Sequence, residues 1–250
     1  MKKKALMLGG MLAALAFAPQ AMAEPSNGWY AAFDLGYHWP DDVEMRSFED
    51  ASDGNPYKYD FEMEGDVAGF ARLGYRLDPN WRLELEGGSR TSDIGAVAGN
   101  PARPLPNTLC SVSSVLPICN TPNGSIQSYT LMANLIYDFM PDATLKPFVG
   151  FGIGVNKLDL SVAARGNSGV QGILIDEEDT VFAYQWLAGL SWDATERLNV
   201  DVTYRYLNGA DADWAASGDS FVDPVGGLKA NYVDHSLTFG VRYAFGQEAA

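Results

Sequence analysis

The chain has few cysteines, few histidines and few basic residues, and each shortage argues against a class of function. Only two cysteines and two histidines occur among 250 residues, so a zinc site, which needs about four such ligands, is not expected. When Lys2, Lys3 and Lys4 are set aside, 14 basic residues remain against 32 acidic ones. Because nucleic acid requires a basic surface for its phosphates, we expect no nucleic-acid partner.

The chain also lacks an apolar run long enough for a membrane-spanning helix, which needs about 20 residues. The apolar stretch of residues 5–17 follows the three lysines and precedes Ala21-Met22-Ala23. A basic start, a short apolar run and a small-x-small sequence are typical of a secretory signal peptide, and the run is too short to favour an uncleaved anchor. We therefore predict that residues 1–23 are a signal peptide and that the mature chain begins at Glu24.

What the mature chain has in abundance is alternation with a period of two. In residues 29–39, one face carries large apolar side chains from Trp29 to Trp39, and the other carries small or polar ones. A single segment of this kind also fits a half-buried soluble strand. The pattern recurs, however, in residues 67–77, 81–86, 129–139, 149–156, 182–192, 198–206 and 233–245.

The connections between these eight segments alternate between short and long. Residues 78–80, 140–144 and 193–197 are short connections, whereas residues 40–65, 91–124, 157–179 and 207–230 are long ones. Short periplasmic turns and long outer loops are typical of outer-membrane barrels. Because hydrocarbon offers no partner to backbone N–H and C=O groups, such a sheet must close on itself. We predict an all-β fold over residues 24–250: an eight-stranded antiparallel up-and-down transmembrane β-barrel with four long extracellular loops, located in the cell outer membrane.

Aromatic residues support this prediction because they gather at both ends of the segments. Two interfacial girdles are expected where amphipathic rings meet the lipid headgroups. The predicted turn-end girdle contains Trp29, Trp81, Phe139, Trp192, Tyr243 and Phe245, and the loop-end girdle contains Trp39, Tyr129, Tyr184, Tyr204 and Tyr206.

Charged residues within the segments share the parity of the small, polar face, which would line the barrel interior. The turn at residues 78–80 makes Arg72 and Glu86 a facing pair, with Arg76 diagonal to Glu84. Eight strands enclose a space that side chains can nearly fill. Our hypothesis is an internal salt-bridge network that plugs or gates the lumen; the alternative is solvated charges with little mutual interaction energy. The predicted members are Asp34, Arg72, Arg76, Glu84, Glu86, Asp201, Arg205 and Arg242.

The sequence offers no catalytic, cofactor-binding or metal-binding constellation, so we do not expect an enzyme. Parity directs His38 inward and His235 to the lipid-facing rim. A catalytic nucleophile and its base must lie within hydrogen-bond reach, so the two histidines cannot act together in one site. Ser236 faces away from His235, unlike the shared face in outer-membrane lipid A deacylases. Residues 150–154 resemble a phosphate loop, but no helix follows, and we expect these glycines to leave interior space.

Two features belong to the predicted long loops. Cys110 and Cys119 lie nine positions apart, and an oxidising compartment favours a disulfide between them. The loops are also acidic, as in residues 176–179. A solvated surface is the simplest interpretation; divalent cations bridging to lipopolysaccharide are an alternative, although no calcium-ligand spacing is present.

Several stretches resemble the transmembrane domain of OmpA-type outer-membrane proteins, in the form common in alphaproteobacteria. The most specific are residues 28–40, 68–76, 128–134, 198–206 and 235–245. The resemblance implies that the final strand is read by the barrel assembly machinery through alternate apolar residues. Full-length relatives often add a periplasmic peptidoglycan-binding domain, but this sequence stops at Ala250, so we do not carry cell-wall anchoring over to it. The residues that match the assembly signal are Phe239, Val241, Tyr243 and Phe245.

A shared barrel does not by itself fix a function. We expect a structural outer-membrane protein, a monomer, that supports envelope integrity and surface interactions. Its expected partners are outer-membrane lipid and lipopolysaccharide. The alternative function is a narrow porin-like channel for ions or small solutes.

Overall fold

The structure is a computed structural model that describes residues 28–50, 54–99, 118–119, 124–163, 174–215 and 226–245. The predicted signal peptide lies outside these residues. Within them, no helix is long and apolar enough to cross a membrane. Thirteen strands form one sheet: β1 (Gly28–Pro40), β2 (Val43–Asp50), β3 (Pro56–Glu64), β4 (Asp66–Arg76), β5 (Trp81–Gly99), β6 (Ile118–Cys119), β7 (Gly124–Asp138), β8 (Leu145–Ala163), β9 (Leu174–Asp193), β10 (Leu198–Gly209), β11 (Ala212–Ala215), β12 (Gly227–Ala230) and β13 (Val233–Phe245).

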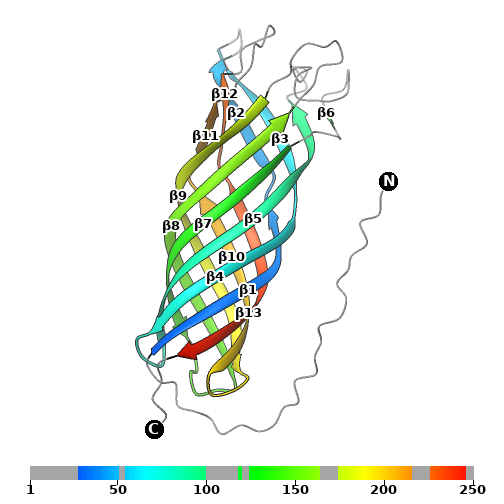
Figure 1. The fold of residues 1–250 in the computed structure, drawn as a ribbon. Coiled ribbons are helices and arrows are strands. Elements are labelled where there is room, and N and C mark those ends of the chain that lie inside the picture. The colour runs from blue at the N-terminus through cyan, green and yellow to red at the C-terminus, as the bar shows by residue number, and fades with distance from the viewer. Residues whose placement is uncertain are drawn as a thin grey trace, which may run out of the picture.

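Eight of these strands close into a ring, which Figure 1 shows as a tilted cylinder. The order around the ring is β1, β4, β5, β7, β8, β9, β10 and β13, and β13 pairs again with β1. Every pairing is antiparallel, and neighbours in the ring follow one another along the chain. The predicted eight-stranded up-and-down barrel is therefore confirmed.

A tight turn sets the register between β4 and β5. The Asp78 carboxylate accepts hydrogen bonds from the backbone N–H groups of Asn80 and Trp81, as aspartate side chains do in turns of this kind. The resulting ladder places Arg72 opposite Glu86. The facing register expected from the sequence is thus correct.

Next to the short turns, the barrel is apolar outside and polar inside. Phe33 and Leu35 of β1 are 60% and 54% exposed, whereas Asp34 between them is fully buried. This is the reverse of a soluble protein, and it is what a hydrocarbon solvent requires. We define the membrane zone as residues 29–39, 67–77, 81–91, 128–139, 145–156, 182–192, 198–206 and 233–245.

Aromatic side chains lie at both ends of the membrane zone. At the turn end, Trp29 is cross-strand partner to Phe245, and both rings are exposed. At the other end, the Trp39 ring stacks on His235, with centroids 5.9 Å apart, and His235 lies between Trp39 and Tyr206 in the ladder. Two groups of outward rings therefore stand where the predicted girdles were placed.

Beyond the second girdle the polarity inverts, in what we define as the extracellular zone. In β2, Val43 and Met45 are buried while Glu44 and Arg46 point outward. The hydrogen bond from Arg46 lowers the pKa of the exposed Glu44 carboxyl. This zone comprises residues 41–50, 54–64, 92–99, 124–127, 157–163, 174–181, 207–215 and 226–232.

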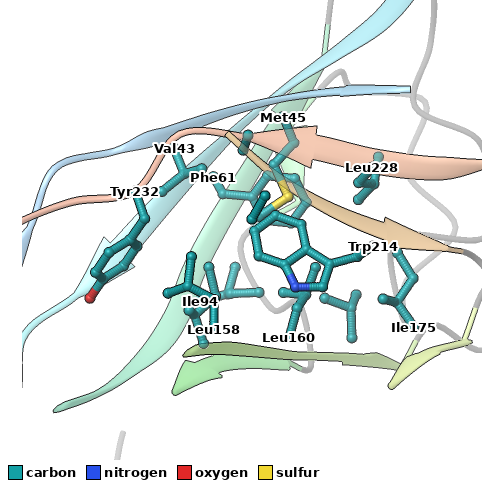
Figure 2. Close-up of a cluster of buried hydrophobic side chains, with 14 of the residues drawn as sticks. Val43, Met45, Phe61, Ile94, Leu158, Leu160, Ile175, Trp214, Leu228 and Tyr232 are labelled. Carbon is teal, nitrogen blue, oxygen red and sulfur yellow. The ribbon is translucent and has the colours of Figure 1, made fainter. Parts of the chain in front are cut away.

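The interior of the extracellular zone is a cluster of large apolar side chains (Figure 2). Trp214, Phe61 and Met45 are essentially without solvent exposure, and burial also raises the pKa of the Tyr232 phenol. We call this group the apolar cluster. It includes Val43, Met45, Tyr59, Phe61, Ile94, Val97, Ile126, Leu158, Leu160, Val162, Ile175, Val181, Leu207, Trp214, Leu228 and Tyr232.

The prediction of four long loops is wrong for much of their length. β2, β3, β11 and β12 fall entirely within the predicted loops, and β5, β8 and β9 continue into them. The period-two alternation continues there too, but water replaces lipid outside and the apolar side chains turn inward. At the outer membrane surface the apolar face of a strand therefore changes from outward to inward, while the strands themselves continue.

Candidate functional site in the barrel interior

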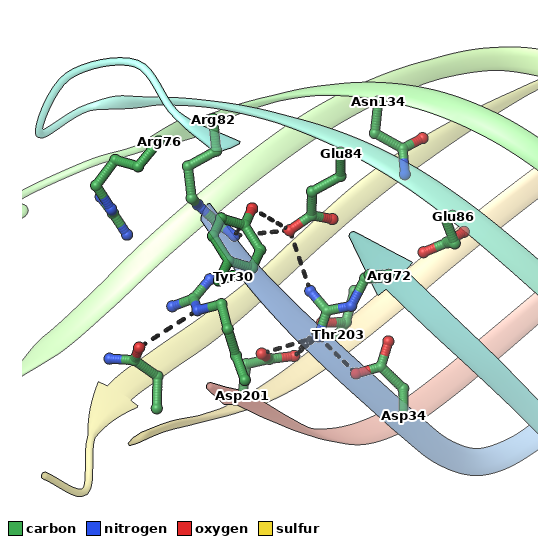
Figure 3. A network of polar contacts seen from close by, with 12 residues as sticks. Tyr30, Asp34, Arg72, Arg76, Arg82, Glu84, Glu86, Asn134, Asp201 and Thr203 are labelled. Atoms are coloured by element: carbon green, nitrogen blue, oxygen red, sulfur yellow. Dashed lines mark hydrogen bonds and ion pairs between the residues drawn. The ribbon is translucent and has the colours of Figure 1, made fainter. Parts of the chain in front are cut away.

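The interior of the membrane zone holds a dense set of charged and polar side chains, part of which is drawn in Figure 3. Strand parity directs these side chains inward, and the ladder of each neighbouring pair sets their height. We call them the lumen network. Its members are Tyr30, Asp34, His38, Arg72, Arg76, Arg82, Glu84, Glu86, Arg90, Asp138, Gln185, Asp201, Arg205, Asp234 and Arg242.

Arg72 lies at the centre of the lumen network and pairs with carboxylates from three other strands. Its Nη2 donates to Asp34 Oδ1 at 2.5 Å and to both oxygens of Asp201 at 3.0 Å. Its Nη1 donates to Glu84 Oε1 at 3.3 Å. A Cβ on Gly240 would lie 2.6 Å from Asp201 Oδ1 and 2.8 Å from Arg72 Nη2. Glycine at position 240 therefore leaves the space in which this cluster forms.

Arg205 joins the same cluster because it binds the other carboxylate oxygen of Asp34. Its Nη2 donates to Asp34 Oδ2 at 2.6 Å, and its Nε donates to Glu86 Oε2 at 3.0 Å. Glu86 also accepts a hydrogen bond of 2.9 Å from Gln185. Asp34 thus bridges two buried guanidinium groups, which satisfies the usual requirement that a buried charge be paired.

A second group lies toward the short turns, at the end we call the periplasmic mouth. Arg82 forms a two-point contact with Asp138, with Nε–Oδ2 and Nη2–Oδ1 distances of 2.8 and 2.9 Å. Its Nη1 donates to Glu84 at 2.9 Å, and the Tyr30 hydroxyl donates to the same carboxylate at 2.6 Å. Arg76 reaches Asp138 at 3.2 Å. The planar guanidinium fork suits this bidentate geometry.

A third group lies toward the extracellular zone. Arg90 Nε is 3.0 Å from Asp234 Oδ1, and Asp234 Oδ2 is 2.7 Å from His38 Nδ1. His38 Nε2 lies 3.0 Å from the carbonyl oxygen of Thr91. The Phe70 ring is contacted by two guanidinium groups, with Arg90 and Arg205 at 4.7 and 4.2 Å from its centroid. His38, which parity directs inward, therefore lies in the barrel interior within hydrogen-bond distance of two groups.

All eight sequence-predicted charged residues have inward-facing positions, but their contacts differ from those expected. Arg72 and Glu86 face each other in the ladder, yet their side chains pair elsewhere, because Arg72 binds Asp34 of the neighbouring strand β1 and Asp201 of β10. Arg76 lies diagonal to Glu84 in the ladder as expected, but the carboxylate that it pairs with is Asp138. Arg242 has no carboxylate within 4 Å among the described residues.

Several network members were missed at the sequence level although their signal was present. Arg82 and Arg90 share the parity of Glu84 in the same strand, and Asp138 ends a strand whose inward positions are polar or aliphatic. Asp234 has the parity of Arg242. Extending parity to both strand ends would have found all four. Gln185, in contrast, carries no charge, and its part in the network depends on its contact with Glu86.

The inward glycines of β8 give space to neighbouring side chains. A Cβ on Gly152 would overlap the Asn134 amide, and one on Gly154 would meet Met132. Met132 and Asn134 are 0% and 2% exposed. The space that these glycines leave in the interior is therefore occupied by neighbouring side chains.

The remaining residues singled out in the sequence are the two histidines, the two cysteines and the assembly signal. His38 is buried inside the barrel, whereas His235 lies on the outer surface, where Nδ1 is 2.7 Å from the Tyr204 hydroxyl. In the part of the chain that the structure describes, no three metal-ligating side chains are gathered. Cys110 lies outside the described residues, so the disulfide with Cys119 stays a prediction. The four residues of the predicted assembly signal, Phe239, Val241, Tyr243 and Phe245, are 65%, 50%, 49% and 41% exposed on the outer face of β13.

The amino-acid sequence has relatives among bacterial proteins. An uncharacterised protein of Brucella suis is 28% identical over 203 residues, which cover 74% of this chain and 70% of the relative. A protein of Gluconacetobacter diazotrophicus named outer membrane protein is 27% identical over 197 residues, which cover 74% of this chain and 48% of the relative.

The fold also has counterparts among solved structures. The outer membrane protein OprG from Pseudomonas aeruginosa superposes with a TM-score of 0.56 at 14% identity, over 87% of this chain and 97% of OprG. The outer membrane protease OmpT from Escherichia coli superposes with a TM-score of 0.52 at 12% identity, over 88% and 97% of the two chains. At these identities the likeness concerns the fold alone. The family described as outer membrane protein beta-barrel domain matches residues 8–245, and this chain is a member of that family and a protein of the bacterial outer membrane.

Proposed function

We propose that this protein is a sealed structural barrel that supports envelope integrity and presents its extracellular zone for surface interactions. The observation that carries the proposal is the burial of the lumen network. Arg82, Glu86 and Arg205 are each 0% exposed although they are charged. Charges held in this way are paired with one another instead of lining a wide water-filled path.

The apolar cluster supports the same proposal from the other end of the barrel. An ion that passed the lumen network would next meet Phe61, Trp214 and Leu160, which are buried among other apolar side chains. Moving an ion into an unpaired apolar environment costs several kcal/mol or more, on the order of the buried-charge penalty. Two barriers of different chemistry therefore stand in series along the barrel axis.

The proposal includes no catalytic step. The two histidines belong to opposite faces of the sheet, His38 inside and His235 outside. The two histidines, both among the described residues, therefore do not contact each other and do not form a shared acid–base site. The likeness to a protease is a likeness of fold at 12% identity, and folds host unrelated functions.

Conductance in a planar lipid bilayer tests the sealed lumen against the narrow channel. We expect the refolded protein to give no stable current steps, while a general porin in the same bilayer gives them. Folding is checked on each sample by the shift in gel mobility between unboiled and boiled protein. Stable, reproducible steps from the heat-modifiable wild-type protein would favour the channel.

Sensitivity of cells tests the structural role. Cells that lack the gene should become more sensitive to detergent and to chelators of divalent cations, and the wild-type gene should restore resistance. Because the proposal assigns the role to the folded barrel, Arg46→Gln, a change on the outer surface of the extracellular zone, should restore resistance as well. Unchanged sensitivity of the deletion strain would contradict the proposal.

A further inference from the structure

Arg242 is a buried guanidinium group that lacks a counter-ion. The residue is 2% exposed. Its Nε donates to the Asn199 side-chain oxygen at 3.4 Å, and its Nη1 has no hydrogen-bond partner among the described residues. Buried charges in proteins are normally paired, and a buried polar group left without a partner requires an explanation.

The carboxylates near Arg242 are already bound to other guanidinium groups. Asp201, next to it along the β10 ladder, accepts hydrogen bonds from Arg72 and Thr203. Glu84 accepts from Arg72, Arg82 and the Tyr30 hydroxyl. All three donors reach Glu84 Oε1, and Glu84 Oε2 has no hydrogen-bond partner within the described part of the chain. Neither Asp201 nor Glu84 lies within 4 Å of the Arg242 guanidinium.

Two other arginines, Arg76 and Arg82, lie at the same end of the barrel as Arg242. The guanidinium carbons of Arg82 and Arg242 lie 5.9 and 5.3 Å from the centroid of the Tyr30 ring. Arg76 lies at the same end of the barrel in Figure 3, beside Arg82, and pairs with Asp138, which Arg82 already holds. Arg76 and Arg82 thus share Asp138 at the periplasmic mouth, and Arg82 also contacts Glu84, whereas Arg242 contacts neither carboxylate.

We propose that the periplasmic mouth binds a small oxyanion, such as inorganic phosphate, at Arg242. A guanidinium fork matches the geometry of phosphate and carboxylate oxygens, and Nη1 is the donor left for such a ligand. Arg76, whose side chain is 13% exposed, stands between this donor and the periplasm and adds a second positive charge. The site faces the periplasm whether or not the lumen conducts, so this inference does not depend on the proposed function.

The bound species is a free anion in the lumen and not the headgroup of a phospholipid. Arg242 points inward from β13, whereas the lipid-facing side of the same strand carries Val241 and Tyr243, which are half exposed. A lipid phosphate on the outer face would meet these apolar neighbours first. The two sources of phosphate can therefore be separated experimentally.

Nuclear magnetic resonance of arginine side chains tests the site in the full folded chain. The protein is labelled with ¹⁵N-arginine, folded in an uncharged glucoside detergent and titrated with inorganic phosphate. We expect one Nε–Hε resonance to shift saturably, and we expect R242Q to abolish the shift. R46Q, which removes an arginine with a 58% exposed side chain in the extracellular zone, should leave it unchanged.

A second variant and a second measurement test phosphate binding if R242Q fails to fold. R242K retains the charge but loses the fork, so it should bind phosphate more weakly than wild type. Phosphate should also raise the thermal unfolding midpoint of the wild type by mass action and raise that of R242K less. The absence of a saturable shift, an equal shift in R242Q, or a response to phosphatidylglycerol vesicles but not to inorganic phosphate would overturn the proposal.

Discussion

At the scale of single residues, the lumen network depends on one position that carries no side chain. Gly240 lies in the ladder between Asp34 and Asp201, at the height where Arg72 crosses the barrel. Strand glycines often mark a place where other groups approach closely. Here the approaching groups are the two carboxylates and the guanidinium that join β1, β4 and β10.

Gly240→Ala should lower the free energy of unfolding by about 1–3 kcal/mol, because the added methyl group overpacks the buried ion cluster. Gly87→Ala in β5 is the matched control, since a Cβ there would meet nothing within 4 Å. Urea unfolding in lipid vesicles measures both. Equal stability of the two variants would contradict the close approach at position 240.

The contacts of Arg205 and Glu86 lead to a second residue-scale prediction. The two groups touch at 3.0 Å, so a double-mutant cycle of Glu86→Gln and Arg205→Gln should give a coupling energy of about 0.5–3 kcal/mol. Arg76 contacts Asp138 and not Glu86, so Glu86→Gln and Arg76→Gln should be additive within about 0.5 kcal/mol. A larger coupling for the second pair than for the first would refute the assigned contacts.

At the scale of elements, single strands pass from one solvent to another. β5 presents Leu83 and Leu85 to lipid and then, beyond Thr91, buries Ile94 inside the extracellular zone. The strand parity is continuous from Leu83 to Ile94, but the solvent outside changes, so the inward face is polar in the first part and apolar in the second. A strand in this barrel therefore cannot be recognised by one hydrophobic pattern along its whole length.

This reversal explains what the sequence does and does not predict. Parity within residues 81–86 predicts both faces of this part of the membrane zone, and the turn at Asp78 predicts the register. Beyond the girdle, acidic residues such as Asp60 and Glu62 resemble loop residues, although they are the outward half of β3. Ion pairs are harder still, because Asp201 reaches Arg72 across the barrel at a separation of 129 residues.

Substitution by arginine on the outer face should have opposite consequences in the two zones. Leu85→Arg places a charge in lipid near the middle of the membrane zone and should cost about 2–4 kcal/mol of folding free energy. Asp60→Arg, on the exposed face of β3, should change stability by less than about 0.5 kcal/mol. Denaturant unfolding of the two variants in vesicles measures the difference, and similar costs would contradict the assigned solvent of each zone.

At the scale of the whole molecule, the closed ring joins two interiors of opposite character. The lumen network occupies the membrane zone, and the apolar cluster occupies the extracellular zone. Closure satisfies the backbone groups that hydrocarbon would leave without partners. It also forces every inward side chain to share one narrow space. The interior is therefore polar where lipid lies outside the barrel and apolar where water lies outside.

The reaction of single cysteines with a membrane-impermeant maleimide tests this arrangement most directly. In a chain with Cys110→Ser and Cys119→Ser, cysteine is introduced at Leu85, Asp60 or Met45, and the protein is inserted into vesicles with its extracellular zone outside. We predict rapid reaction at position 60, which faces water, and no reaction at position 85, which faces lipid, or at position 45, which is buried. Reaction at position 85 as fast as at position 60 would contradict the account.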